Sequence, residues 1–409
     1  QRIASEDRDR ANRYTALALK SRAMLYAGTI AKYGKVSNNS FQGIRKEMAK
    51  TYLLEAAKAA KEIVDDGKYA LSTEFGDLFN GKDENNNEII FRFANVAKTG
   101  VAVYEDYWYQ SYRIKRAGYC AFMVPPLDVV EQFETLDGKI QPLDYAASKN
   151  NPEDFFANRD KRLDATVIYP GGEFLGERFS IYRKTLVKRT DGTTEEYSYE
   201  KSEDWMGAGK VPGHEKYMKS GADGIFLNLS AAGTTNWGFF LKKTLYGVKR
   251  LDDYLIQEND QDAVVIRYGE VILNLAEAAV ELSTYGVNDY LAVAQVAFDQ
   301  LRSIHGGLPA KTMDLEVVRH ERRIDLMYEG FRYWDLKRWR IGMHNKTLKA
   351  LYPILHIDET TSPASVYYTL EKVEAPDLAT RVKWFEERDY YCPLPLSKSP
   401  GIVQNDGWN

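Results

Sequence analysis

Cysteine and histidine are scarce in this chain. Its 409 residues include two cysteines, Cys120 and Cys392, which cannot build a disulfide framework or a cysteine-rich zinc site. None of the five histidines stands at metal-ligand spacing from a second histidine or a cysteine. We therefore expect neither a metal site nor a cofactor.

An excess of charge of one sign is also missing, and so are long apolar runs. Lysine and arginine number 55 against 59 aspartates and glutamates, which gives a net charge of −4. A dedicated nucleic-acid binder would be far more basic, so nucleic acid is excluded as the expected partner. No stretch approaches the roughly 18 consecutive apolar residues that a membrane-spanning helix needs.

Familiar catalytic motifs are incomplete. Gly76, Gly81 and Lys82 have the spacing of a phosphate-binding loop, but Asp83 follows where a serine or threonine should hold magnesium. The G-x-S-x-G signature of serine hydrolases is absent. Carboxylates are plentiful, and a glycosidase would place two of them about 5–10 Å apart. Sequence spacing does not reveal that separation, so a glycoside hydrolase stays open as an alternative.

Helical periodicity is clear in two parts of the chain. Small and apolar residues recur at steps of three and four over residues 14–28 and 48–63, and Gly67 follows the second stripe. These stripes predict a helical repeat pair within residues 1–74, similar to one tetratricopeptide unit. Stripes return over residues 268–282 and 290–304, so residues 263–342 should hold further helical repeats.

The remaining segments lack this periodicity. In residues 75–262, glycine, asparagine, aspartate and proline punctuate short apolar runs, and EIIFRF alternates like a strand. Long irregular segments of a compact protein usually carry its function, so we expect this loop-rich region to bind the ligand. Residues 343–409 are punctuated by proline and are predicted to form an irregular carboxyl-terminal region.

The densest charge cluster is VRHERRIDLMYEGFRYWDLKRW, residues 318–339. Charges interleaved so closely with large apolar residues cannot all face solvent, and a buried charge must be paired. The i,i+3 spacing favours the pairs Arg322–Asp325 and Asp335–Arg338. We expect an ion-pair framework that locks helices to the carboxyl-terminal region, with Trp334 and Trp339 in the core; an acid–base set or an anion site is the alternative. The framework residues are Arg322, Asp325, Glu329, Arg332, Asp335 and Arg338.

Five segments, in order, resemble the SusD/RagB family, the glycan-binding outer-membrane lipoproteins of Bacteroidetes. ERRIDLMYEGFRYWDLKRW is similar to the family signature, and RYTALALKSRAMLYAG with YLLEAAKAAKEIVDDGKYAL to its helical repeats. FFANRDKRLDATVIYPG, VVIRYGEVILNLAEAAVEL and YYCPLPLSKSPGIVQNDGWN resemble three further family motifs, with Lys161, Gly269 and Asp406 where the family usually has proline, alanine and proline. The lipid-attachment cysteine and the first helices of the family are absent, so we expect a chain without its amino-terminal part.

The resemblance implies one SusD-like domain over residues 1–409, with an all-α fold. Tetratricopeptide-like helical repeats would scaffold a loop-rich region with a few short strands. It also implies a non-enzymatic, lipid-anchored protein on the cell surface of the outer membrane. Such a protein captures oligosaccharides for polysaccharide utilisation and delivers them to a SusC-like TonB-dependent transporter. Its lipid anchor, not present in this chain, would be the membrane contact. A peptide-binding member of the same family and a bare helical scaffold for protein partners are further alternatives.

Sugar capture would use aromatic rings exposed on loops, because a pyranose packs the C–H groups of one face on a flat ring. The sequence contains 28 tyrosines, and VYEDYWYQSYR (residues 103–113) is its most aromatic segment. The long charged loop around residue 205 and the segment GTTNWGFF supply two further tryptophans. The predicted ligand-binding residues are Trp108, Tyr109, Tyr104, Tyr112, Trp205 and Trp237.

Overall fold

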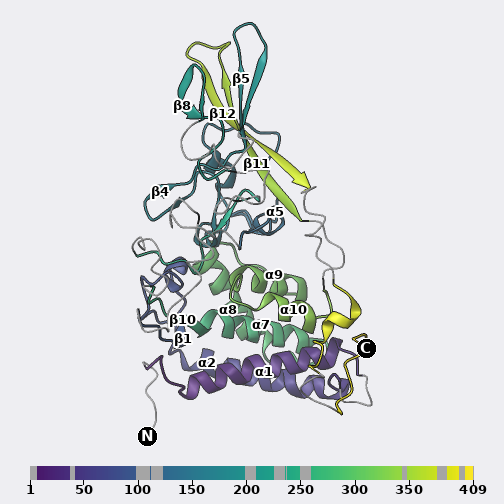
Figure 1. The fold of residues 1–409 in the computed structure, drawn as a ribbon. Helices are drawn as coiled ribbons and strands as arrows, with labels where there is room; N and C mark the ends of the chain where they lie inside the picture. The colour runs from purple at the N-terminus through teal and green to yellow at the C-terminus, as the bar shows by residue number, and fades with distance from the viewer. Residues whose placement is uncertain are drawn as a thin grey trace.

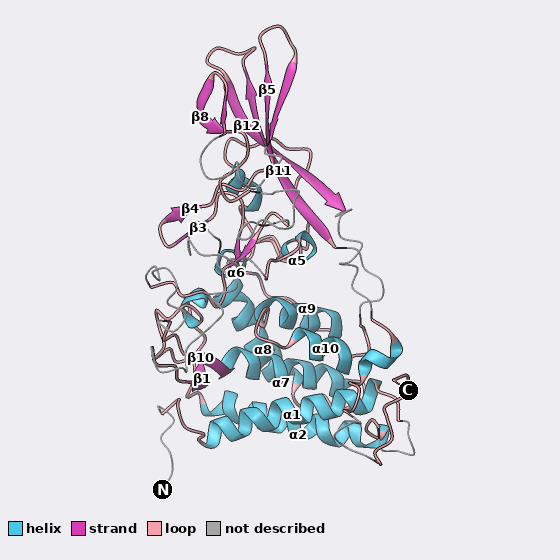
Figure 2. Ribbon diagram, in the orientation of Figure 1, coloured by secondary structure: helices cyan, strands magenta, loops and turns pink. Residues whose placement is uncertain are grey.

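The computed structural model describes residues 7–36, 42–97, 111, 123–198, 209–224, 235, 237–248, 259–342, 348–374, 385–395 and 401–408. Helices form the base of the molecule, and strands and loops rise from it into a narrower upper part (Figures 1 and 2). Among the described helices, none has the length and apolar character required to cross a membrane.

The base begins with a close antiparallel pair, α1 (Arg13–Tyr33) and α2 (Ala49–Asp66). Arg13 at the start of α1 pairs with Asp66 at the end of α2, at 2.8 Å. Gly28 permits the close approach, because a Cβ there would lie 2.8 Å from the side chain of Leu53. Gly67 ends α2 with φ +58°, a left-handed cap that glycine adopts without strain.

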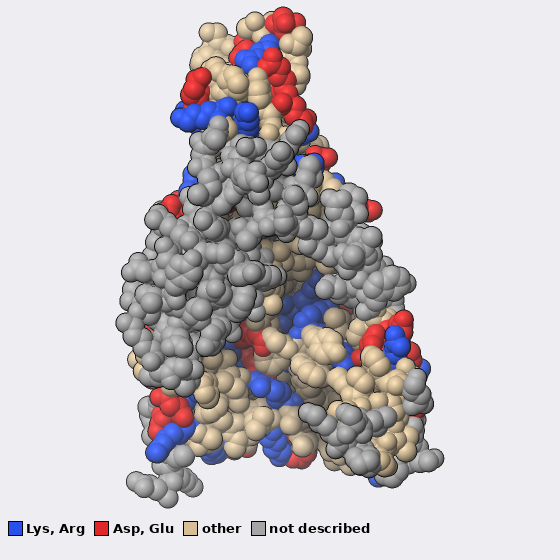
Figure 3. Space-filling view, viewed as in Figure 1, with Lys and Arg blue, Asp and Glu red and all other residues tan. Residues whose placement is uncertain are grey.

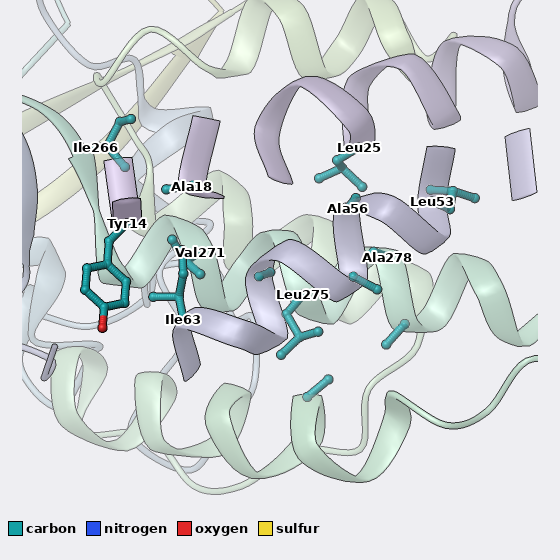
Figure 4. Close-up of a cluster of buried hydrophobic side chains, with 14 of the residues drawn as sticks. Tyr14, Ala18, Leu25, Leu53, Ala56, Ile63, Ile266, Val271, Leu275 and Ala278 are labelled. Carbon is teal, nitrogen blue, oxygen red and sulfur yellow. The ribbon is translucent and has the colours of Figure 1, made fainter. Parts of the chain in front are cut away.

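Four further helices complete the base: α7 (Tyr268–Ser283), α8 (Leu291–Leu301), α9 (Leu315–Asp325) and α10 (Arg332–Arg338). α7 packs on the first pair through fully buried side chains that include Leu25, Leu53 and Leu275 (Figure 4). Short helical segments occur elsewhere: η2 (Lys46–Met48), η3 (Phe75–Leu78), α5 (Leu127–Val130), η4 (Pro152–Phe156), α6 (Arg162–Thr166), η6 (Arg302–Gly306) and η8 (Glu387–Tyr390).

The upper part contains a four-stranded mixed sheet of order β12-β11-β5-β6 (Figure 2). Its strands are β5 (Lys184–Lys188), β6 (Thr194–Ser198), β11 (Lys349–Asp358) and β12 (Ser365–Glu374). β11 and β5 are parallel, and the other two pairings are antiparallel. Four two-stranded ladders pair β1 (Ile89–Phe93) with β10 (Ala263–Arg267), β2 (Val167–Ile168) with β9 (Phe240–Leu241), β3 (Glu173–Phe174) with β4 (Glu177–Arg178), and β7 (Lys210–Val211) with β8 (His214–Met218).

This sheet corrects two expectations from the sequence. The fold is helical at its base but not all-α, and residues 343–409 are not irregular throughout, because β11 and β12 are ten residues each. Pro353 suggested an irregular segment, but it lies one residue before the β11–β5 ladder begins at Ile354. At that place the missing proline N–H interrupts no pairing between β11 and β5.

A buried carboxylate joins the helical base to the segments above it. Asp325, at the end of α9, is fully buried and pairs with Arg162 at 2.9 Å, Arg267 at 2.6 Å and His305 Nδ1 at 2.8 Å. Glu88 closes the cluster by contacting Arg267 at 2.8 Å and His305 Nε2 at 2.9 Å. Four segments far apart in sequence therefore meet at one carboxylate.

Burial and pairing act in opposite directions on these groups. Burial alone would raise the pKa of Asp325, but the charges of Arg267, His305 and Arg162 hold it well below its usual range. Burial would likewise lower the pKa of His305, yet Glu88 and Asp325 raise it to about 9. The histidine is therefore a cation at neutral pH and part of the ionic cluster.

The expected framework forms a second cluster, in which the predicted pair Asp335–Arg338 is confirmed and the predicted pair Arg322–Asp325 is wrong. Arg322 contacts Asp335 at 3.0 Å rather than Asp325, and Arg338 contacts Asp335 at 2.8 Å. Arg338 also donates to Glu277 of α7 at 2.6 Å. In the described part of the chain, the partners of the framework residues all precede residue 340. The framework thus locks helices to one another instead of to the carboxyl-terminal region.

We predict that Asp325→Asn destabilises the protein severely. The neutral amide leaves Arg162, Arg267 and His305 with one counter-charge fewer in a buried site, which costs about 3–5 kcal/mol. Chemical denaturation followed by circular dichroism measures this loss. Glu55→Gln is the matched control, because it breaks the solvent-exposed pair with Lys20 and should leave the midpoint unchanged. Equal midpoints for wild type and Asp325→Asn would contradict the prediction.

We also predict that stability falls as the pH rises from 6.5 to 9. Folding raises the pKa of His305 from 6.5 to about 9, so the folded state holds this proton more tightly than the unfolded state. The contribution of His305 to the free energy of unfolding is fully present below pH 6.5 and decreases as the pH rises to 9. The total decrease is about 3 kcal/mol. Denaturation across this range, with His305→Gln for comparison, checks it. A profile as steep in His305→Gln as in wild type would assign the dependence to other groups.

Candidate functional site

One cavity of the described structure has a volume of about 440 Å³ and a polar lining. It lies among η3, α6, the β3–β4 turn and residues 242–247. Its charged rim combines both signs, with four carboxylates and three ammonium groups: Glu74, Asp77, Asp164 and Glu173, and Lys82, Lys161 and Lys242.

The floor of the cavity belongs to the buried ionic cluster. Lys243 and His305 line the cavity, and both side chains have no exposed surface. Lys243 donates to Glu329 at 2.7 Å and to the carbonyl of Asp325 at 2.9 Å. Its ammonium lies 4.3 Å from the ring centroid of Phe79, and burial lowers its pKa. The floor is therefore held by the same contacts that join the base to the upper part.

The rim is held more loosely. The Nζ atom of Lys82 lies 3.8 Å from Oδ1 of Asp77, and the Nζ atom of Lys242 lies 3.4 Å from Oδ2 of Asp164. The side chain of Lys161 makes no hydrogen bond or ion pair with any described residue. Donors and acceptors at the rim can thus exchange their partners for groups of a ligand without breaking a tight buried pair.

The backbone around the cavity contains two uncommon conformations. Leu175 and Thr244 both line the cavity, with φ of +51° and +75°. Positive φ is costly for residues with a side chain, and most of all for a β-branched residue such as threonine. Such conformations cluster at binding sites, where the surrounding structure imposes them.

This lining suits hydrogen bonding to a polyhydroxylated ligand. Carboxylates accept from hydroxyl groups, ammonium groups donate to them, and the amide of Asn80 can do both. The volume lies in the range of about 300–1,000 Å³ that is usual for small-molecule sites. Within the described residues, no group of three histidine, cysteine or acidic side chains is arranged to hold a metal ion.

Most of the aromatic residues predicted to bind the ligand lie outside the described residues: Tyr104, Trp108, Tyr109, Tyr112 and Trp205. Trp237 is described, and its side chain is in the core with 6% exposure. Its N–H donates to Thr235 Oγ1 at 3.0 Å, and its carbonyl accepts from the N–H of Leu351 in β11 at 3.1 Å. These bonds hold the segment against the sheet and cover the indole. The expectation of an exposed ring at Trp237 is therefore corrected.

Trp334 departs from the sequence expectation in the opposite sense. Trp339 is in the core at 2% exposure, as expected, but Trp334 is 50% exposed. The two positions are five residues apart, about 140° around a helix, so one ring can be buried while the other is not. Trp334 packs edge-on against Tyr333, with ring centroids 5.1 Å apart. It borders a second cavity, of about 220 Å³, that Tyr26, Tyr390 and Tyr391 also line.

Sequence reasoning missed the polar cavity. Its residues come from five separate segments, and none of them forms a recognisable motif. The one signal was the incomplete phosphate-loop spacing at Gly76, Gly81 and Lys82, which falls on the cavity wall at Gly76 and Lys82. The chemistry of that motif does not apply, but the turn that creates the spacing does shape the site.

Several solved structures have a fold similar to that of this chain. The solved structure of a SusD-like protein from Bacteroides fragilis matches with a TM-score of 0.62 and 18% identity, over 99% of this chain and 67% of that one. A SusD-like carbohydrate binding protein from the same species matches with a TM-score of 0.52 and 22% identity, over 83% of this chain and 61% of that one. A surface glycan-binding protein A from Bacteroides fluxus matches with a TM-score of 0.55 and 16% identity, over 99% of this chain and 65% of that one. This chain therefore spans about two thirds of the length of these structures. The curated proteins include no match.

At these identities the solved structures establish the fold alone, and a family model carries the assignment further. The model of the SusD family matches residues 87–408, which is most of the chain. The match includes the cavity wall from residue 161 onward and the charged segment of α9 and α10. On this evidence the protein belongs to the SusD family.

Proposed function

We propose that this protein captures oligosaccharides at the cell surface and delivers them to a SusC-like TonB-dependent transporter, while a lipid anchor holds it at the outer membrane. Family membership supports the proposal, as do fold relatives described as carbohydrate binding and surface glycan-binding. The observation that carries it is the polar cavity of about 440 Å³, which offers both hydrogen-bond donors and acceptors.

The cavity would bind sugar hydroxyls through its rim. Asp77 and Asp164 would accept hydrogen bonds from hydroxyl groups, while Lys161 and Lys242 would donate hydrogen bonds to hydroxyl oxygens. A hydrogen bond to a charged group contributes about 1.5–3 kcal/mol when it is well formed. The loose rim pairs give up little when a sugar takes their place, so much of that energy would remain for binding.

Aromatic rings would supply the apolar half of the contact. We propose Trp108 and Trp205, with the tyrosines at 104, 109 and 112, as the platform on which pyranose faces pack. Such rings pack against C–H groups without needing a particular hydroxyl pattern. The cavity would then select among sugars, and the rings would add affinity.

We expect the protein to retain oligosaccharides without cleaving them. The test incubates the protein with a panel of neutral and acidic oligosaccharides, then measures retention by calorimetry and new reducing ends by a colorimetric assay. Binding with a constant number of reducing ends supports capture. New reducing ends would overturn it in favour of a glycoside hydrolase. Retention of a peptide panel instead of sugars would favour a peptide-binding member of the family, and retention of neither would leave a scaffold for protein partners.

We predict that Trp108→Ala and Lys161→Ala each weaken sugar binding about tenfold. Each removes one contact worth about 1.4 kcal/mol, a stacking ring in one case and a donor in the other. Neither side chain is expected to support the fold, so the thermal midpoint should not change. Isothermal titration with the best ligand of the panel measures the affinity.

Matched controls separate the two surfaces. Trp237→Phe alters a ring in the core and Lys50→Ala an exposed lysine at the start of α2, so both should bind as wild type does. Loss in Trp108→Ala alone would assign binding to the rings, and loss in Lys161→Ala alone would assign it to the cavity. Unchanged affinity in both would remove the proposed site while the family assignment stands.

A further inference from the structure

A smaller cavity, of about 230 Å³, adjoins the polar cavity at Thr244, which lines both. We call it the side pocket; Phe79, Thr244, residues 261–264 and residues 328–329 form it. Its volume is below the range of about 300–1,000 Å³ that is usual for whole small-molecule ligands. The side pocket therefore suits one substituent of a larger ligand that lies in the polar cavity.

Gln261 brings an unpaired acceptor to the wall of the side pocket. Its side chain is in the core, with 6% exposure. Its Nε2 donates to the carbonyls of Phe79 and Thr244, at 3.3 Å to the latter. Both of these residues line the side pocket, so the amide group is held in its wall. The Oε1 atom is buried and accepts no hydrogen bond from a described residue. A buried acceptor without a donor is costly, so a donor is missing from this arrangement.

The surroundings fix the orientation of this amide. Turning it over would place Oε1 against two carbonyl oxygens and break both bonds of Nε2. The backbone N–H of Gln261 is also held, because it donates to Asn259 Oδ1 at 2.8 Å. Thr244 and Tyr328 line the side pocket with φ of +75° and +62°, a conformation that clusters where a binding site imposes it. The acceptor is thus in place before a ligand arrives.

The charged groups of the side pocket are already paired. Asp262 pairs with Arg92 at 2.9 Å. Glu329 pairs with Lys243 at 2.7 Å and with Arg267 at 2.8 Å. The visible face of the described structure likewise carries charges of both signs (Figure 3). A cationic ligand would therefore meet no uncompensated carboxylate in the side pocket, and the missing donor is a neutral group.

We propose that the side pocket binds the acetamido group of an N-acetylated amino sugar, whose N–H donates to Gln261 Oε1. This inference rests on the proposed function and adds the ligand class. An acetamido group combines a neutral N–H donor with a methyl group. The side pocket combines the unpaired acceptor with the apolar side chains of Phe79 and Val264, which pack on one another. A hydroxyl group could also donate, but it has no apolar part to bury against these walls.

The decisive experiment titrates the protein with matched pairs of oligosaccharides that differ in acetamido against hydroxyl groups. The pairs are the β1,4-linked N-acetylglucosamine trimer against cellotriose, and N-acetyllactosamine against lactose. The glucosamine trimer, which carries ammonium groups instead, is the cationic comparison. We expect the acetylated member to bind roughly tenfold more tightly, because a sugar without the N–H leaves the buried acceptor unpaired.

Two variants test the side pocket by different routes. Gln261→Leu removes the acceptor, so it should lose the preference and keep its affinity for the unacetylated sugars. Ala263→Phe fills the side pocket from an exposed position at the start of β10 and should also lose the preference, with an unchanged thermal midpoint. It decides the matter if Gln261→Leu fails to fold. Val265→Phe is the matched control, because Val265 is an exposed residue of the same strand outside the pocket lining, and it should behave as wild type does.

The outcomes separate this inference from its basis. Equal affinity within both pairs would overturn the acetamido site and leave the acceptor to a water molecule, while sugar capture stands. A preference that survives in Ala263→Phe, or that Val265→Phe removes equally, would overturn it too, because the side pocket would not be its source. Tighter binding of the glucosamine trimer would assign the side pocket to a cation instead. Absence of binding across the whole oligosaccharide panel would refute the proposed function itself.

Discussion

The contact of the Asp325 carboxylate with Arg162, Arg267 and His305 is the interaction on which the rest of the structure depends. Each of these groups would be costly to bury alone, and together they neutralise one another at 2.6–2.9 Å. The cationic groups come from α6, the end of β10 and η6. Because one carboxylate contacts all of them, the end of α9 is buried only when α6, the end of β10 and η6 all pack against it.

The same cluster links the framework to the candidate site. His305 and Lys243 are at once members of the network and the floor of the polar cavity. Inside the network the pairs are tight and fully buried, whereas the rim pairs are at 3.4 and 3.8 Å. The protein thus holds its charges rigidly where they support the fold and loosely where a ligand can reach them.

The charged segment of α9 and α10 contains both paired and unpaired arginines within a few residues. Arg322 and Arg338 each meet carboxylates in the core. Arg332 lies between them in sequence, yet it has no partner among the described residues. Composition alone does not distinguish these arginines, because each is flanked by aromatic and acidic neighbours. The difference arises from the folded positions of the nearby carboxylates, which the core arginines have already taken.

Several features could be predicted from the sequence because they depend on local physics. The stripes of small residues over 14–28 and 48–63 produce a close helix pair, and Gly67 ends the second helix because glycine tolerates positive φ. The density of charge over residues 318–339 required burial with pairing. By contrast, the partners of Asp325 lie 20, 58 and 163 residues away, at distances that no spacing rule encodes. The burial of Trp237, the exposure of Trp334 and the polar cavity were likewise decided by tertiary structure, because each depends on which distant segment packs against which. Local propensity is a property of neighbouring residues, whereas charge pairing, solvent exposure and cavity shape are properties of the folded whole.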